Sequence, residues 1–170
     1  MPSAPVWVRA KGVNHTLASS TEVTMVFSSE NVDTDSAYDT STGVFTAPSD
    51  GVYDIAGRVL ITFSRTTTSG TGSVGYSMSM KVNNGLSVTI GGNTYTDNAS
   101  RDVATWVVGS SSVLYSKLHR NLFALETGDT IKFTITRFGD VGTNGTVTVT
   151  AGSAVDSSSF FEARRVSDLP

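Results

Sequence analysis

The chain has 170 residues, no cysteine, a formal net charge of −3 and 16% charged residues, against about 25% in an average soluble domain. This length suits one domain with a full core, and the lack of cysteine excludes disulfide scaffolds and zinc sites built on thiolates. No apolar run approaches the roughly 18 residues of a membrane span and no basic cluster is present, so we expect neither membrane insertion nor nucleic-acid binding.

The composition indicates an all-β protein. Ser and Thr occur 24 times each and Val 21 times, against 8 Leu. Residues branched at Cβ fit a pleated, half-buried surface better than a helix. Ser and Thr, used here as polar filler in place of Lys and Glu, are weak helix formers.

The N-terminal part predicts three short strands. Val6 to Val13 and Val23 to Phe27 are rich in β-branched residues, and Gly43 to Thr46 is a third candidate. The polar stretch from Ser28 to Thr42 has no periodicity, so we expect a loop. Pro48 and the sequence Ser49-Asp50-Gly51 predict a tight reversal before the next strand.

Val52 to Phe63 is predicted to be the longest strand. Its alternate positions place one set of side chains on one face, which we expect to point into the core: Tyr53, Ile55, Gly57, Val59, Ile61 and Phe63. Gly57 in the middle of this strand indicates a bulge or a close approach of another segment.

The second half continues the pattern of strands and polar connections. Strands are expected at Tyr76–Val82, Leu86–Ile90, 103–108, 131–136, Thr146–Thr150 and Phe160–Val166. Loops are expected at 64–75 and 91–102, and turns at 83–85 and 139–145.

The segment from Val113 to Leu125 fits two structures. Its leucines stand at helical spacing, and Leu114, Leu118 and Leu122 also share one face of a strand. Helix propensity slightly favours a helix. We favour a strand, because an isolated helix is poorly accommodated within a two-sheet sandwich. About ten short strands in one domain then predict a β-sandwich of the jelly-roll type.

No catalytic constellation is evident, so we expect no enzymatic activity. His15 and His119 have no Asp or Ser partner at motif spacing, and a polar surface role explains both. No Gly-x-Ser-x-Gly elbow and no phosphate-binding loop occurs in the chain.

The acidic residues Asp33, Asp35 and Asp39 are the candidate metal ligands. Their carboxylates are of the type that calcium prefers, although the segment lacks the EF-hand spacing. The competing interpretation, a solvated acidic loop without any cofactor, is the one we favour.

One block of residues resembles a known family. Tyr38-Asp39, Thr42-Gly43-Val44-Phe45-Thr46-Ala47-Pro48 and Gly51-Val52-Tyr53 resemble the signature of C1q-like domains. Leu125, Gly128-Asp129 and Ile131 resemble that family's entry into a late strand. Ser159-Phe160 resembles its closing segment.

The resemblance implies a ten-stranded jelly roll of the C1q and tumour-necrosis-factor type that forms a homotrimer. It would span residues 6–166, between a short arm (1–5) and a tail (167–170). The motif residues would have structural roles in turns and core: Gly43, Phe45, Pro48, Gly51, Tyr53, Gly128, Asp129 and Phe160.

The functional expectation is a structural protein of a tailed bacteriophage. A C1q-like unit without cysteine, and with no export signal evident near Met1, resembles trimeric capsid decoration (cement) and fibre-head proteins. It would assemble in the host cytoplasm and sit on the virion surface. Its partners would be further copies of itself and either the major capsid protein or another virion protein. The two ends of the chain would bind that virion protein.

The alternative is a binding head for a host receptor or glycan, on a tail fibre or as a C1q-like module. Loops on a rigid sandwich commonly carry recognition. In this interpretation the loops 64–75, 91–102 and 139–145 form the binding surface. Tyr95 and Arg101 are its candidates for stacking and hydrogen bonding.

Overall fold

The structure is a computed structural model. It describes residues 5–12, 15–16, 21–67, 72–83, 88–90, 93–95, 98–106, 109–138, 145–151 and 159–169. Within these ranges the backbone alone is described at 63–67, 72–75, 88–90, 93–95, 98–106, 109–117, 119, 138 and 145–151. No helix in the described part of the chain is long and apolar enough to cross a membrane.

A seven-stranded antiparallel sheet forms one layer of the molecule. Its main part runs in the order β12 (Gly109–Leu125), β7 (Gly51–Thr67), β15 (Phe160–Ser167), β1 (Trp7–Lys11) and β4 (Ser29–Asp33). On the edge where the first half of β7 pairs with β15, its second half pairs with β14 (Gly145–Ala151). Strand β14 in turn pairs with β2 (His15–Thr16). The first and last long strands, β1 and β15, are therefore neighbours.

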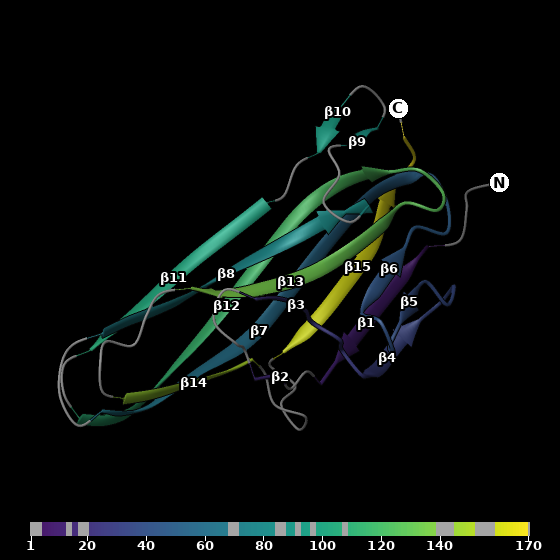
Figure 1. Cartoon of the computed structure of the whole chain (residues 1–170). Helices are drawn as coiled ribbons and strands as arrows, with labels where there is room; N and C mark the ends of the chain where they lie inside the picture. Colours follow the sequence, from purple (N-terminus) through teal and green to yellow (C-terminus); the bar gives the residue numbers. More distant parts are fainter. Residues whose placement is uncertain are drawn as a thin grey trace.

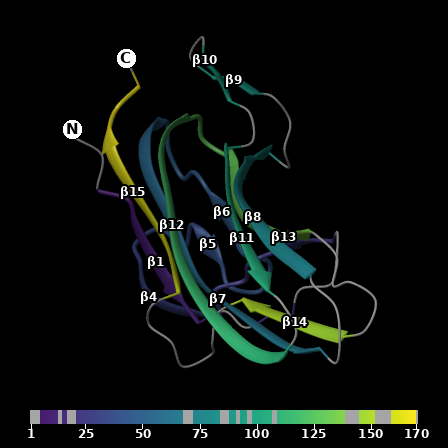
Figure 2. The same ribbon diagram turned by 90° about the vertical axis from the view of Figure 1, so that its left-hand side faces the viewer.

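A six-stranded sheet forms the second layer. Its order is β11 (Asn98–Trp106), β8 (Gly72–Val82), β13 (Thr130–Phe138), β6 (Val44–Thr46) and β5 (Tyr38–Asp39), with β3 (Glu22–Thr24) also on β13. A separate two-stranded ribbon consists of β9 (Val88–Ile90) and β10 (Asn93–Tyr95). Figures 1 and 2 show the two sheets facing each other, with the ribbon beyond one end.

The predicted alternation places the core between the sheets. Tyr53, Ile55, Val59 and Ile61 of β7 are completely buried, whereas the residues between them are mostly half-buried on the other side of the sheet. The same alternation holds on the facing sheet, where the buried set is Tyr76, Met78, Met80 and Val82 on β8 and Ile131, Phe133 and Ile135 on β13. The two strand faces thus meet as a sandwich core requires.

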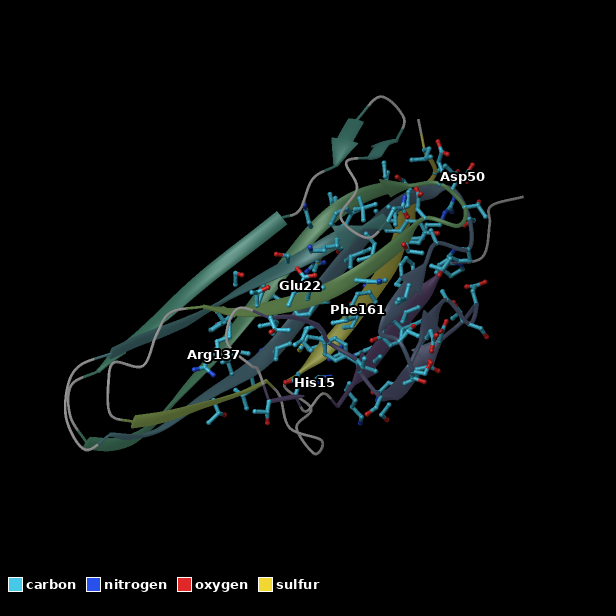
Figure 3. All side chains as sticks on the ribbon, in the orientation of Figure 1. His15, Glu22, Asp50, Arg137 and Phe161 are labelled. Carbon is cyan, nitrogen blue, oxygen red and sulfur yellow. The ribbon has the colours of Figure 1, made fainter. Side chains whose placement is uncertain are left out.

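Phe161 of β15 is the centre of an aromatic cluster in this core (Figure 3). Its ring centroid lies 5.0 Å from that of Tyr38, 6.1 Å from Phe45 and 6.3 Å from Phe27. Rings at such distances add specific edge and stacking attraction to their burial. The cluster joins residues from both sheets and from the segment before β4.

Gly57 confirms the predicted close approach. The pairing of β7 with β12 and β15 passes through Gly57 without a bulge. A Cβ atom at this position would lie 2.6 Å from Cε2 of Phe133 on the facing sheet. The missing side chain therefore makes room for an aromatic ring in the core.

The segment from Val113 to Leu125 is a strand, as favoured. Strand β12 pairs with β7 along its whole length, from Gly109 opposite Thr67 to Leu125 opposite Gly51. Phe123 and Leu125 point into the core, and Leu118 and Leu122 point outward. The spacing of four between Leu118 and Leu122 fits one face of a helix and equally one face of a strand, so it could not decide between the two.

Three predicted loops are wrong in part. The stretch 28–42 contains β4 and β5, the stretch 64–75 contains the end of β7 and the start of β8, and the stretch 91–102 contains β10 and the start of β11. Edge and end segments pair through their backbones, which the periodicity of apolar side chains does not reveal. Strand β3 ends at Thr24 and is therefore shorter than predicted. Met25 and Phe27, which follow it, are nevertheless buried.

Candidate functional site

The block that resembles the C1q signature is a structural unit at one end of the sandwich. Gly43 has a φ of 74°, and a Cβ there would lie 2.7 Å from the carbonyl oxygen of Met25. The buried rings of Phe45 and Tyr53 meet edge to face with centroids 5.6 Å apart. The hydroxyl of Tyr53 donates to the carbonyl of Ser49 at 2.7 Å.

The reversal predicted at Pro48 to Gly51 carries the chain from one sheet to the other. Strands β6 and β7 on either side of it lie in different sheets and do not form a hairpin with each other. Side chains from distant segments hold this crossing in place. Arg165 Nε donates to the carbonyl of Asp50 at 2.9 Å and lies over Gly51, where a Cβ would clash with it.

Gly128 and Asp129 form the predicted turn before β13. Gly128 has a φ of 92°, which favours glycine. The Asp129 carboxylate accepts from the backbone N–H of Glu126 and from Nδ2 of Asn83, each at 2.8 Å. The turn also exchanges two backbone hydrogen bonds with Ala47, so it is tied to the sheet crossing.

The candidate metal ligands are engaged in local turns. Asp33 accepts from the backbone N–H groups of Ala37 and Tyr38 at 2.9 Å each. Asp39 accepts from Ser41 and Thr42, and these hydrogen bonds lower its pKa to about 2. The described residues contain no group of three or more acidic or histidine side chains placed to hold a metal ion.

The structure does not place Tyr95 and Arg101 on one recognition loop. Tyr95 ends β10 opposite Val88 in the ribbon, and Arg101 lies within β11 opposite Ser77 in the six-stranded sheet. The side chains of both residues lie outside the described part of the structure. His15 lies half-buried in β2, and His119 is a residue of β12.

A surface that the sequence did not single out lies on the solvent side of the seven-stranded sheet. This surface, here termed the outer face, spans β1, β15, β7 and β12. Three rows of paired residues cross it in that strand order: Trp7–Arg164–Asp54–Leu122, Arg9–Glu162–Ala56–Arg120 and Lys11–Phe160–Arg58–Leu118.

The outer face carries three of the four large hydrophobic side chains that are exposed among the residues with described side chains, and the fourth, Val166, lies at the register shift of β15 outside the three rows. Trp7 is 41% exposed, Leu118 52% and Leu122 57%, and Val166 at the end of β15 is 55% exposed. A concentration of exposed apolar groups on one face marks an interaction surface. The alternation of side chains along β1 and β12 was the available signal, but without the strand order Trp7, Leu118 and Leu122 could not be placed on one face.

Charged side chains lie between these apolar groups. Arg120 Nε donates to Oδ1 of Asp54 at 2.7 Å, and Arg9 Nη1 lies 3.1 Å from Oε2 of Glu162. The Arg9 guanidinium stacks over the Phe160 ring at 4.9 Å, and that of Arg164 lies 5.9 Å from the Trp7 ring. The hydrogen bond from Arg120 lowers the pKa of Asp54 below its usual range.

A shallow hollow of about 80 Å³ opens at the centre of the outer face, where Ala56 is shorter than its neighbours. Its wall combines apolar and charged groups: Asp54, Ala56, Leu118, Arg120, Phe160 and Glu162. A hollow this shallow, on the exposed side of a sheet, suits a protruding side chain of another protein better than a buried small molecule.

Comparison of sequences matches no family model and no curated protein. Comparison of structures finds the globular domain of zebrafish complement 1qA, with 15% identity, a TM-score of 0.50 and coverage of 97% of this chain and 98% of that one. It also finds murine APRIL, with 13% identity, a TM-score of 0.53 and coverage of 96% and 100%. The TNF Eiger of S. frugiperda gives 10% identity, a TM-score of 0.57 and coverage of 98% and 95%. The chain therefore has the jelly-roll fold of C1q and TNF domains, as its signature residues predicted.

Proposed function

We propose that this protein is a non-enzymatic structural protein that works as a homotrimer, with the outer face as the contact between copies. The observation that supports this most is that three of the four exposed large hydrophobic side chains of the described residues, Trp7, Leu118 and Leu122, lie on this one face. A second copy is the occupant that the charge distribution supports.

The outer face is basic, whereas the rest of the molecule is acidic. It holds five cationic side chains and two carboxylates, a formal charge of +3 within a chain of −3, so the remainder carries −6. Two such faces repel each other across a two-fold axis. Contact between the basic face of one copy and an acidic surface of the next is head-to-tail, the arrangement that closes into a ring.

The edge of strand β12 that faces away from β7 also favours contact with another copy. Among the described residues β12 pairs with β7 only, which leaves the other edge of a 17-residue strand without a sheet neighbour. Long uncovered edges promote uncontrolled pairing between chains, and proteins commonly cover them. A neighbouring copy on the outer face at β12 would shield this edge as well.

The place of action that we propose is the surface of a tailed-phage virion, as a capsid decoration (cement) protein. The composition supports this: a chain rich in Ser and Thr, with no cysteine, suits a particle assembled in the reducing cytoplasm of a host cell. The capsid protein or another virion protein would be its second partner.

Substitutions on the outer face test the self-association. Leu118→Glu and Leu122→Glu place a carboxylate in the apolar part of the contact, and each should raise the trimer dissociation constant at least tenfold, about 1.4 kcal/mol. Thr46→Glu is the matched control, because Thr46 is exposed on the six-stranded sheet. Light scattering after size exclusion measures the mass. Equal masses for L118E, L122E and T46E would contradict the proposed contact.

Purified virions test the place of action. Mass spectrometry should detect the chain in particles, and a cryo-electron microscopy map should show trimers on the capsid lattice. Density at a fibre tip would favour the binding head instead. Particles that lack the chain altogether would refute both virion roles.

A second candidate function is a binding head for a host receptor or glycan. The observation in its favour is the β9–β10 ribbon, whose strands pair with each other and with neither sheet (Figure 1). The ribbon extends beyond the sandwich, where a partner can reach it. Glycan-array binding that is lost when residues 88–95 are replaced by a short Gly-Ser linker would support this role, and unchanged binding would clear the ribbon.

A further inference from the structure

The acidic charge of the chain is concentrated on one flank of the sandwich. No Lys or Arg occurs between positions 12 and 57, a stretch that holds seven carboxylates. Four of them lie in β4, in β5 and in the short connection between these strands: Glu30, Asp33, Asp35 and Asp39. This surface, here termed the acidic flank, carries −4 of the −6 that remain outside the outer face.

The acidic flank has no cation of its own. Among the described residues, no Lys or Arg pairs with any of its four carboxylates, and the ion pairs that are formed join other side chains. Asp33 accepts from the backbone N–H of Ala37 at 2.9 Å and Asp39 from that of Ser41 at 2.7 Å. These hydrogen bonds fix the position of the negative charge without neutralising it.

Other carboxylates of the described residues have cations beside them. At the end of the sandwich where β6 crosses to β7, Arg165 forms an ion pair with Asp168 and donates to the carbonyl of Asp50. On the six-stranded sheet, Glu22 pairs with Lys81 at 2.8 Å. The acidic flank is therefore the described surface whose negative charge is left without compensation inside one copy.

The outer face presents the complementary charge. Its five cations outnumber its two carboxylates, and both carboxylates already have an arginine partner. Lys11 on β1 lies between Phe160 and Ser29, so neither neighbouring strand places a carboxylate opposite it. Surfaces of opposite charge steer two copies into one orientation and accelerate their association.

The acidic flank adjoins the outer face along one line. Strand β4 pairs directly with β1, with Val32 opposite Arg9 and Ser29 opposite Lys11. Strands β4 and β5 are the last strands of the two sheets, so the flank closes the sandwich on the side next to β1 (Figure 1). Complementary surfaces that meet at an edge turn each successive copy in the same sense and can close a small ring, whereas complementary surfaces on opposite faces give an open stack.

We infer that the acidic flank of one copy docks on the outer face of the next, which makes the trimer a head-to-tail ring. This inference rests on the proposed self-association and names the surface that the outer face binds. Glu30 and Asp35 are the carboxylates that we assign to ion pairs across the contact. Both are exposed, and neither accepts a backbone hydrogen bond from the described residues, whereas Asp33 and Asp39 hold turns.

Charge reversal on the flank, followed by sedimentation velocity of the full chain at pH 7, tests the inference. Glu30→Lys with Asp35→Lys should raise the trimer dissociation constant at least tenfold at low salt. Near-ultraviolet circular dichroism should be unchanged, because both side chains are exposed. Glu30→Gln with Asp35→Asn, which alters shape least, should weaken association by less. Added salt should weaken the wild-type trimer more than the reversed variant, because it screens exposed charges.

The matched control is Glu22→Lys with Glu126→Lys, which changes the net charge equally at exposed positions outside the flank. It should associate as the wild type does. Equal weakening by the control and by the reversed flank would reveal a general effect of net charge and overturn the docking surface. Wild-type association of the reversed flank would also overturn it and leave self-association standing. A wild type that is monomeric at pH 7 overturns both proposals.

The absence of cysteine allows a direct test of the head-to-tail arrangement, because a chain with one introduced thiol can cross-link only to another copy. Chains with Asp35→Cys and chains with Arg164→Cys, mixed and treated with a short bismaleimide, should cross-link to each other. Chains with Arg164→Cys alone should not. Cross-linking of Arg164→Cys chains among themselves, without products in the mixture that contain Asp35→Cys, would mean that two outer faces meet and would overturn the docking of flank on face.

Discussion

Gly57 shows how one residue sets the spacing of the two sheets. Only glycine fits at this position, because the Phe133 ring from the opposite sheet occupies the volume that a side chain would need. Gly128 differs, because a Cβ there would meet nothing within 4 Å and only its φ of 92° disfavours other residues.

Gly57→Ala should therefore lower the free energy of unfolding by about 1–3 kcal/mol through overpacking. Denaturant unfolding measures the loss. Phe133→Leu in the same chain should recover part of it, because the smaller side chain frees the space. A G57A protein as stable as the wild type would show that the core accommodates the methyl group and that the close approach does not matter.

Asp39 gives the fold a pH dependence that belongs to one turn. Hydrogen bonds from Ser41 and Thr42 lower its pKa to about 2, below the value of about 3.9 in an unfolded chain. A carboxyl group with a lowered pKa stabilises the folded state above the unfolded pKa, and this contribution is lost as pH falls toward the folded pKa.

Asp39→Asn should thus be less stable than the wild type at pH 6, and the two stability curves should converge between about pH 4 and pH 2. Thermal unfolding across this pH range measures both curves. Parallel curves with a constant gap would mean that the turn is held by contacts other than the charge of Asp39.

At the scale of the elements, alternation of side chains predicted the central strands well. The inward set on β7 and the strands β8 and β13 were predicted correctly, because each strand has one buried face. Strand β4 and the first part of β11 were predicted as loops because they lie at sheet edges, where the sequence is polar and only the backbone pairs. Tyr95 and Arg101 therefore lie in two strands and not in one loop, and their role in binding stays a prediction.

The end of the chain was predicted to be a tail but packs on the domain. Strand β15 extends to Ser167, Arg165 forms an ion pair with Asp168, and Leu169 packs against the core. Residues 167–169 therefore help to stabilise the end of the sandwich at which β6 crosses to β7. Binding of a virion protein by the chain end would have to use residues other than Leu169.

Leu169→Ala should lower the unfolding free energy by about 1 kcal/mol, which corresponds to about 2–4 °C in the melting temperature of a domain of this size. Differential scanning calorimetry measures the shift. Ser29→Ala, at an exposed position of β4, is the control that should leave the melting temperature unchanged. An unchanged melting temperature for L169A would return the segment to a free tail.

At the scale of the whole molecule, the signature residues predicted the fold, and the sheet order then revealed the outer face. Trp7, Leu118 and Leu122 come to lie on one face only because β1, β15, β7 and β12 pair side by side, an arrangement of strands that Figure 2 shows. That placement depends on pairing between strands far apart in the chain, which local patterns do not encode.

Sedimentation velocity of the full chain at neutral pH and micromolar concentration tests the self-association most directly. We predict one species of about three times the chain mass of 17.9 kDa, and a shift toward the monomer for L118E but not for T46E. A wild-type chain that sediments as a 17.9 kDa monomer under these conditions would contradict a trimer built on the outer face.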